Sequence, residues 1–491
     1  MDAAEMSPKP YQLTAFEALE AIDSGKLSST ELVSSVLERL DQVEEKVHAY
    51  ITVDREGALE RAEEIDRRIE SGENPGRLRG LPIAIKDSIV TKGIRTTCGS
   101  RMLYNFIPPY SATAVEKLIQ EGAVIVGKTN CDEFTMGTTT ETSHFGPTYN
   151  PWSLDRVPGG SSGGSAACMA ADEATLSLGT DTGGSIRCPA SFCGVVGLKP
   201  TYGRVSRYGL IAYASSLDQI GTITKDVADS ALLLSIVAGR DEKDATSIDR
   251  PTEDFTSYLG RDVDGQVFAV PEEFLGEGTN EEVVKATFRV ADALEEMGAR
   301  REEVSLPSLE YSLATYYIIA MCEASSNLAR YDGVRYGFSV PSKANWIKAY
   351  SDTRGRGFGA EVRRRIILGT YALSAGYYNA YYMKALKIRT LIKRDFERAF
   401  EKVDFLVTPT MPSPAFKIGE LADPLTMYLQ DVDTVPVNLV GLPAISYPSG
   451  FADGLPIGVQ MIGRYFEEGR LISVASALEK KLPHEERPVL S

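Results

Sequence analysis

Apolar residues in the first seventy positions recur at helical spacing. Ser28 and Glu31 form a capping-box pattern, which predicts a helix that begins directly after Ser28. The apolar residues behind it repeat every three or four positions and share one helical face: Leu32, Val33, Val36, Leu37 and Leu40. A further helix is predicted over 58–71, because the Gly- and Pro-containing segment 72–76 then breaks the pattern. The sequence therefore opens with amphipathic helices.

From residue 80 onward, short apolar runs alternate with helical stretches. The runs 81–85, 123–126 and 175–178 are typical of strands, and 113–120 is typical of a helix. This alternation predicts an α/β fold, in which helices cover both faces of a large, mostly parallel central sheet. In such folds the functional groups lie on the loops that connect strands and helices.

The second half of the chain continues with longer helices and returns to strands near its end. Helical segments are predicted over 227–238, 281–297, 309–330, 358–400 and 468–481, and strands over 267–270, 405–407, 444–447 and 457–462. No repeat and no long polar linker divides the chain. We therefore expect a single domain over 1–491. It would comprise a helical lead-in (about 1–75), a core (about 76–240) and a C-terminal half (about 241–491) that completes the sheet and the substrate pocket.

Composition narrows the class of protein. Of the 491 residues, 43% are hydrophobic and 24% are charged, as in ordinary globular proteins. The chain has 52 Lys and Arg against 68 Asp and Glu, a formal net charge of −16, which makes it a poor candidate for binding nucleic acid by itself. No apolar run approaches 18 residues, and the polar, acidic first ten residues do not resemble a signal peptide. We expect a cytoplasmic protein with no membrane association.

Cysteine and histidine usage excludes several catalytic designs. Six cysteines in 491 residues are too sparse for a disulfide framework, and we interpret them as buried small apolar residues. The three histidines are His48, His144 and His484. Because His48 and His484 lie in charged or polar segments, both are expected to be solvated. A Ser-His-Asp triad or a histidine metal centre would then depend on His144 alone, so we expect no metal site.

The segment 158–165, Pro-Gly-Gly-Ser-Ser-Gly-Gly-Ser, has the composition of a flexible linker. A helix-forming run follows it directly, which favours a place inside the fold. A phosphate-binding loop is a second alternative, since glycines bring backbone N–H groups close to an anion at a helix N-terminus. The lysine that ends the common nucleotide-binding form of such a loop is missing here.

A second glycine-rich segment, 179–187, places Ser185 directly after two glycines. A serine at this point can act as a nucleophile. The backbone amides of Thr182, Gly183, Gly184 and Ser185 are then candidates for an oxyanion hole. With histidine scarce, the candidate base is Lys86, which follows the apolar run 81–85; desolvation there lowers the pKa of an amine. A lysine at a strand end is, on its own, more often solvated or ion-paired.

Three segments together resemble the amidase signature family: Gly-Leu-Pro-Ile-Ala-Ile-Lys-Asp (80–87), Pro-Gly-Gly-Ser-Ser-Gly-Gly-Ser (158–165) and Asp-Thr-Gly-Gly-Ser-Ile-Arg (181–187). The resemblance implies the amidase signature fold and a catalytic triad of Ser185, Ser161 and Lys86. In that family the nucleophile, here Ser185, attacks an amide carbonyl. Ser161 relays the proton to neutral Lys86 and later returns one to the leaving nitrogen. The resemblance also implies a cis peptide between Gly160 and Ser161.

Other polar residues of these segments are expected to support the site. Ser162 would stabilise the loop by hydrogen bonding, and Ser165 would be the N-cap of the following helix. Asp181 and Arg187 carry opposite charges on one loop, so we expect them to hold the loop in place rather than to act chemically.

Within the family, the chain most resembles the amidase subunits of tRNA-dependent amidotransferases. The resemblance is carried by segments 127–134, 140–143, 365–378 and 423–428. A free amino acid presents a carboxylate and an ammonium group, which call for a guanidinium and a carboxylate. The residues that resemble the glutamine-binding set are Arg364, Asp431 and Tyr316. The register within Arg363, Arg364 and Arg365 stays open, and Arg364 would otherwise be a surface charge.

The resemblance implies a glutaminase that needs no cofactor of its own. It would hydrolyse glutamine through an acyl-Ser185 intermediate and pass ammonia to B and C subunits of a heterotrimer. A partner subunit would bind the misacylated tRNA and, with ATP and Mg²⁺, convert Glu-tRNA(Gln) to Gln-tRNA(Gln), Asp-tRNA(Asn) to Asn-tRNA(Asn), or both. The alternatives are a free-standing amidase that acts on aryl or aliphatic amides, and a catalytically inactive scaffold subunit.

Overall fold

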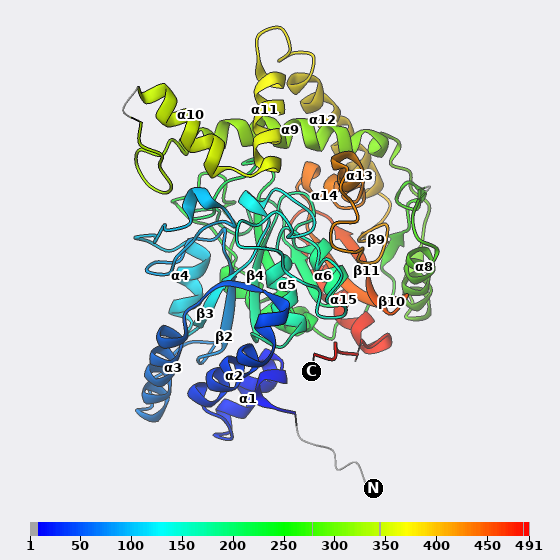
Figure 1. Cartoon of the computed structure of the whole chain (residues 1–491). Helices are drawn as coiled ribbons and strands as arrows, with labels where there is room; N and C mark the ends of the chain where they lie inside the picture. Colours follow the sequence, from blue (N-terminus) through cyan, green and yellow to red (C-terminus); the bar gives the residue numbers. More distant parts are fainter. Residues whose placement is uncertain (1–7, 277, 343–344, 485, 491) are drawn as a thin grey trace.

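One mixed sheet, with eleven strands among the described residues, runs through the protein (Figure 1). The computed structural model describes residues 8–276, 278–342, 345–484 and 486–490. The strand order is β1-β3-β2-β4-β6-β5-β10-β11-β9-β7-β8. The strands are β1 (Tyr50–Val53), β2 (Pro82–Lys86), β3 (Val124–Thr129), β4 (Leu176–Asp181), β5 (Val196–Lys199), β6 (Gln219–Thr224), β7 (Val267–Ala269), β8 (Arg300–Arg301), β9 (Phe405–Pro409), β10 (Ala444–Ala452) and β11 (Leu455–Gly463).

The expectation of a mostly parallel sheet is wrong, although the α/β class is confirmed. Among the described strand pairs, only β2–β3, β2–β4, β7–β8 and β7–β9 are parallel, and the other six are antiparallel. The cause lies in the connections. A parallel pair needs a long crossover, whereas β10 and β11 are joined by a two-residue turn. Asp453 and Gly454 form this turn with φ angles of 51° and 77°, as a tight hairpin requires.

The N-terminal helices are α1 (Ala15–Asp23), α2 (Ser29–Val47) and α3 (Arg55–Glu70). The predicted capping box is confirmed: the Glu31 amide donates to Ser28 Oγ at 3.1 Å, and the Ser28 amide donates to Glu31 Oε2 at 2.8 Å. The predicted apolar face of α2 is buried. These helices lie together at one end of the sheet (Figure 1).

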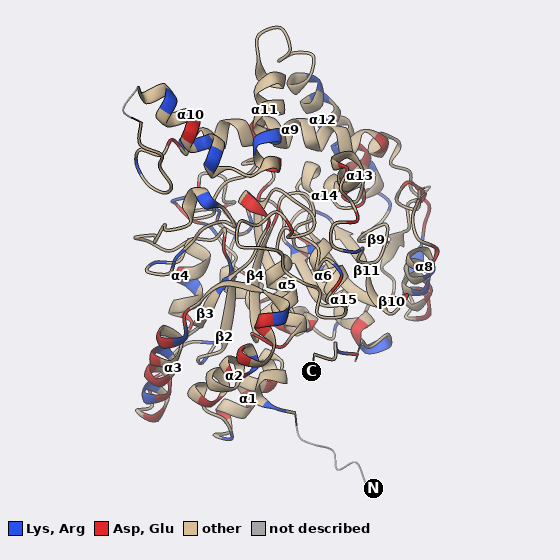
Figure 2. Cartoon of the chain, in the orientation of Figure 1, with Lys and Arg blue, Asp and Glu red and all other residues tan. Residues whose placement is uncertain are grey.

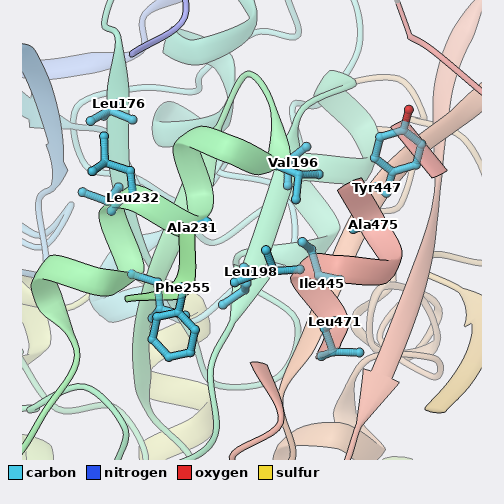
Figure 3. Packing of buried hydrophobic residues seen from close by; sticks show 14 of the residues in the cluster. Leu176, Val196, Leu198, Ala231, Leu232, Phe255, Ile445, Tyr447, Leu471 and Ala475 are labelled. Atoms are coloured by element: carbon cyan, nitrogen blue, oxygen red, sulfur yellow. The ribbon is translucent and has the colours of Figure 1, made fainter. Parts of the chain in front are cut away.

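Helices cover both faces of the sheet, as predicted. Ile83 and Ile85 of β2 point into the core that lies under α4 (Thr113–Gln120), α7 (Val227–Val237), α8 (Glu281–Glu296) and α15 (Glu468–Lys481). The residue between them, Ala84, points to the opposite face, under α5 (Gly163–Ala170) and α6 (Arg187–Cys193). In Figure 3, Val196 and Leu198 of β5 pack with residues of α7 and α15, so this core joins both halves of the chain.

The remaining helices form a group above the sheet, with α9 at its centre (Figure 1). They are α9 (Ser312–Asn327), α10 (Trp346–Gly357), α11 (Ala360–Leu373), α12 (Tyr382–Ala399), α13 (Pro424–Leu429) and α14 (Val435–Val440). Both α11 and α12 pack against α9. The helical segment predicted over 358–400 is thus divided by 374–381, where Gly376 has a φ of +89°.

The six cysteines are free and buried, as predicted. His48 is exposed, as predicted, and His144 is exposed as well. The prediction for His484 is wrong: its ring stacks on Phe451, with centroids 5.3 Å apart, and lies 6.1 Å from Trp152. Within the described ranges, no helix has the length and apolar character needed to cross a membrane.

Candidate active site

Lys86 lies at the end of β2, which is buried between β3 and β4. Its side chain has no solvent exposure. The Nζ atom donates to Ser161 Oγ at 2.8 Å, to Ser162 Oγ at 2.9 Å and to Thr180 Oγ1 at 2.8 Å. Burial lowers the pKa of Lys86 to about 8, although neighbouring thiols and carboxyl groups oppose the shift. A neutral amine is therefore accessible near neutral pH, next to a serine hydroxyl.

Ser161 lies on the glycine-rich loop that precedes α5, and the Gly160–Ser161 peptide is cis, as the resemblance implied. A Cβ atom at Gly160 would overlap the Asp132 carboxyl group, and one at Gly159 would lie 2.8 Å from Pro189 Cα. The glycines are thus required by close packing inside the fold, which excludes the flexible linker. A phosphate-binding loop is also disfavoured, because a buried carboxyl group rather than a cation faces Gly160.

Of the two other serines of the loop, Ser162 has the expected role and Ser165 does not. Ser162 does stabilise the loop, since its hydroxyl donates to the Thr180 carbonyl at 3.1 Å, but it also accepts a hydrogen bond from Lys86. Ser165 is not the N-cap of α5, because the helix begins two residues earlier. Its hydroxyl lies 2.7 Å from Thr129 Oγ1 and donates to the Leu178 carbonyl at 3.1 Å, so it ties α5 to the sheet.

Ser185 lies on the turn between β4 and α6. Its carbonyl accepts from the Ser162 amide at 3.1 Å, which places it beside the Ser161 loop. Ser185 is 7% exposed, whereas Lys86 and Ser161 are fully buried. Among the described residues its hydroxyl has no hydrogen-bond partner. Of the three residues, Ser185 is therefore the one that a substrate can reach.

Asp181 and Arg187 hold this turn, as predicted. The carboxylate of Asp181 accepts from Arg187 Nε and Nη2, both at 3.1 Å, and from the amides of Gly184 at 2.9 Å and Ile186 at 3.2 Å. Burial opposes ionisation, but the charge and hydrogen bonds of Arg187 keep the pKa of Asp181 below its ordinary value. Asn438 of α14 donates to the same carboxylate at 2.8 Å.

These contacts correct the expected oxyanion hole. The Gly184 amide is occupied by Asp181, so it is not free for a substrate oxygen. The amides of Thr182, Gly183 and Ser185 have no acceptor within the described part of the chain. The backbone here is fixed by side chains: Thr434 Oγ1 donates to the Gly183 carbonyl at 2.6 Å, and Thr182 Oγ1 donates to Asp218 at 2.7 Å. Of the four expected oxyanion-hole amides, three therefore remain available to a substrate oxygen within the described residues.

A cavity of about 400 Å³ opens beside the Ser161 loop. Residues 137–139 form one wall, and Thr139 packs directly on Gly160. The start of α11 and the helix α13 contribute to the remaining walls, through Arg365 and Tyr428 among others. The cavity is thus adjacent to the Ser161 loop and large enough for an amino acid.

Asp431 is buried between the cavity wall and α9. Its carboxylate accepts from Thr138 Oγ1 at 3.0 Å and from the Tyr317 hydroxyl at 2.6 Å. Burial raises the pKa of Asp431 to about 6, against the two hydrogen bonds. A cationic group bound at this point would favour the ionised form.

Arg364 and Arg365 both line the cavity, and Arg365 is the buried one of the two. Arg364 is exposed at the cavity mouth and pairs with Glu361. Arg365 is 4% exposed and donates to Glu361 Oε1 and to the Tyr213 hydroxyl, both at 2.7 Å. Its guanidinium carbon lies 5.3 to 5.6 Å from the ring centroids of Tyr213, Tyr317 and Tyr428. Successive helical residues point about 100° apart, and the packing of α11 on α9 decides which arginine faces inward.

Tyr316 is buried but is not among the described residues that line the cavity, so its role as a wall of the substrate pocket stays a prediction. A Cβ at Gly183 would overlap its hydroxyl. It thus supports the Ser185 turn. The neighbouring Tyr317, which sequence reasoning missed, is the tyrosine that binds Asp431; nothing in the sequence separates the two. Within the described residues, no group of three or more His, Cys, Asp or Glu side chains could hold a metal ion.

Comparison with known proteins assigns the family. The sequence profile described as Amidase matches residues 31–472. The chain belongs to the amidase family. This amidase is 57% identical over 482 residues to the A subunit of the glutamyl-tRNA(Gln) amidotransferase of Carboxydothermus hydrogenoformans, with 98% of this chain and 99% of the relative covered.

Two solved structures show whether the backbone fold alone distinguishes amidases that act on different substrates. The A subunit of the glutamyl-tRNA(Gln) amidotransferase of Thermotoga maritima has a TM-score of 0.82, 46% identity, and coverage of 99% of both chains. A bacterial aryl acylamidase of the amidase signature family has a TM-score of 0.83 but only 26% identity, with 96% of this amidase and 97% of that chain covered. The backbone is therefore shared across different amide substrates, and the distinction rests on side chains.

Proposed function

We propose that this amidase hydrolyses glutamine to glutamate and ammonia through an acyl-Ser185 intermediate. One observation carries the proposal: the 2.8 Å hydrogen bond from the fully buried Lys86 amine to Ser161, on a loop that contacts Ser185. Among the described residues, the hydrogen-bond partners of Lys86 are hydroxyl and carbonyl groups rather than carboxylates, and its pKa is lowered to about 8. Such a lysine is suited to act as a base.

In the proposed mechanism Ser161 transfers protons between the nucleophile and the lysine. Its hydroxyl takes the proton of Ser185 and passes its own to Lys86 as Ser185 attacks the amide carbon. The amides of Thr182, Gly183 and Ser185 stabilise the oxyanion. The relay then runs in reverse and protonates the nitrogen, which leaves as ammonia. A water molecule, activated by the same relay, hydrolyses the ester to glutamate.

Two charged side chains would select an amino acid. The Arg365 guanidinium binds the α-carboxylate, in place of Arg364, and the Asp431 carboxylate binds the α-ammonium group. Tyr317 orients Asp431, and Tyr316 supports the Ser185 turn. Arg365 lines the cavity and Asp431 lies directly behind the wall residue Thr138, so opposite charges stand close to one cavity. A zwitterion requires such a pair, whereas a simple aryl or aliphatic amide has no use for it.

We further propose that the ammonia serves a tRNA-dependent amidotransferase, because a relative at 57% identity carries the name of one. This amidase would associate with B and C subunits in a heterotrimer. A partner subunit would hold the misacylated tRNA and use ATP and Mg²⁺ to convert Glu-tRNA(Gln), Asp-tRNA(Asn) or both. The net charge of −16 supports this division, since an acidic chain repels the tRNA backbone.

Asp431→Asn tests the substrate. The variant keeps the hydrogen-bonding shape but loses the charge, so kcat/KM for glutamine should fall about 10- to 100-fold. Turnover of butyramide, which lacks the α-ammonium group, should change little. Unchanged glutamine turnover in Asp431→Asn would contradict the glutaminase assignment and favour the free-standing amidase. Absence of any amide hydrolysis in the assembled wild-type complex would favour the inactive scaffold.

A further inference from the structure

One face of α11 is exposed and apolar. Ile367 is 66% exposed, and Leu368 and Tyr371 are about half exposed. The connection to α12 adds two half-exposed tyrosines, Tyr377 and Tyr381. We call these five residues the tyrosine face. Isolated apolar side chains are common on protein surfaces, but a contiguous group of this kind marks an interaction site.

The tyrosine face is prearranged. The ring centroids of Tyr371 and Tyr377 are 4.5 Å apart, and Tyr381 lies 6.1 Å from the first and 6.0 Å from the second. Because the rings already hold one another, binding to them costs little side-chain entropy. Exposed tyrosines ordered in this way are typical of the energetically dominant centre of a protein–protein interface.

The tyrosine face begins at the mouth of the active-site cavity. Arg364 lines the cavity, Ile367 lies three residues further along α11, and Tyr371 seven, so the three share one side of the helix. The buried Arg365 of the same helix faces the proposed glutamine site. A partner seated on the tyrosine face would therefore lie next to the opening through which ammonia leaves.

The charge around the face is opposite to that of the molecule. The segment 360–400 has nine Lys and Arg against three Asp and Glu, whereas the whole chain has 52 against 68. Figure 2 shows Lys and Arg on α11 and α12, above a body in which both signs are mixed. Lys384 and Lys387 are exposed in the first two turns of α12, which begins directly after Tyr381, whereas Lys393 further along pairs with Glu397. This surface complements an apolar patch that is bordered by carboxylates.

We propose that the tyrosine face is the docking surface for a partner subunit of the amidotransferase, which contacts it through an apolar patch with an acidic rim. The inference rests on the proposed function, because that function requires an ammonia acceptor. A protein is favoured over tRNA, since nucleic-acid interfaces are polar and offer nothing to an exposed Ile367 and Leu368. Docking here couples ammonia release to the acceptor subunit.

The test uses the full chain and its own partner subunits, purified separately. Ile367→Asp buries a charge at the centre of the contact, so the affinity for the partner subunits, measured by titration calorimetry, should fall at least tenfold. Ile119→Asp makes the same change on α4, on a distant side of the molecule, and should bind like the wild type (Figure 1). Tyr377→Ser, on the connecting segment rather than a helix, guards against misfolding and should also weaken binding. Circular dichroism melting of each isolated variant verifies its fold.

Equal binding by wild type, Ile367→Asp and Tyr377→Ser would overturn the proposal. So would binding of tRNA to the wild-type chain alone at 0.15 M salt that is lost in Ile367→Asp while subunit binding persists. Glutamine hydrolysis by the wild-type complex is measured in parallel. If that activity is absent while Ile367→Asp still fails to bind, the proposed function is wrong and the docking surface stands.

Discussion

Burial sets the acid–base chemistry of single residues in this amidase. Lys86 has no solvent exposure and three hydroxyl partners, which makes its neutral form available. Asp431 is held by two hydroxyl groups, which leaves its charge for a ligand. The same physical cause, desolvation, thus lowers the pKa of the amine, which favours its role as a base, and raises the pKa of the carboxyl group, which a bound cation would oppose.

The pKa of Lys86 predicts the pH profile. The base must be neutral, so kcat should rise about tenfold per pH unit below the Lys86 pKa of about 8 and level off above it. Steady-state kinetics of glutamine hydrolysis between pH 6 and 9.5 measures this rise. Ser162→Ala, which removes a hydrogen bond to the amine, should shift the midpoint while keeping the shape. A flat profile over this range would show that another group is the base.

The two neighbouring arginines make a matched pair. Arg365→Lys loses the planar guanidinium in a buried cage, so the KM for glutamine should rise about 10- to 100-fold. Arg364→Lys changes an exposed ion pair and should leave KM within about twofold. Initial-rate kinetics of both variants decides which of the two arginines binds glutamine. Similar KM values for the two variants would contradict the assignment of Arg365.

The proposed catalytic residues Lys86, Ser161 and Ser185 could be named from sequence, because each lies in a short contiguous motif whose glycines and polar residues are locally determined. Arg365 could not be separated from Arg364, because only the packing of α11 on α9 decides which side chain is buried. Occupation of the Gly184 amide by Asp181 also depends on a folded turn.

At the scale of elements, the start of α11 is attached to the body through Glu133, which lies on a 3₁₀ helix (Glu133–Thr135). Its carboxylate accepts from the Gly359 amide at 2.7 Å, and from Ser100 Oγ on the other oxygen. Burial raises the pKa of Glu133 to about 7. Because α11 carries Arg365, this attachment positions part of the proposed glutamine site.

Removal of the Glu133 carboxylate should therefore affect binding more than chemistry. Glu133→Ala leaves two donors without an acceptor, which should cost about 1–3 kcal/mol of stability and raise KM severalfold while kcat is retained. Glu133→Gln keeps one acceptor and should be intermediate. Thermal melting and initial-rate kinetics measure both effects. A fall in kcat with unchanged KM would place Glu133 in the chemistry instead.

Helices were easier to predict than strands. The helices α4 and α15 match their predicted ranges residue for residue, because amphipathic spacing and breakers are local. The strands β1, β5, β6 and β8 were missed, and these short segments acquire strand character only by pairing across the sheet. The Asp-Gly turn between β10 and β11 was a readable signal for an antiparallel hairpin.

At the scale of the whole molecule, one sheet joins the two halves of the chain. The strand β10 pairs with β5, and α15 packs on α7, so the C-terminal part completes the core of the N-terminal part. This arrangement supports the predicted single domain over 1–491, whose internal boundaries stay a prediction. The net negative charge of the chain and the positive charge of the segment 360–400 can both be counted from the sequence. That this segment lies at the mouth of the cavity could be seen only in the folded structure.

The central claim is that Ser185 is the nucleophile of a glutamine-specific site. The most direct measurement is peptide mass spectrometry of the assembled complex after reaction with a glutamine-derived diazoketone. The predicted result is one covalent adduct on Ser185, which excess glutamine prevents and which is absent in Ser185→Ala but present in Ser162→Ala. An adduct on another residue, or equal labelling of Ser185→Ala, would contradict the account.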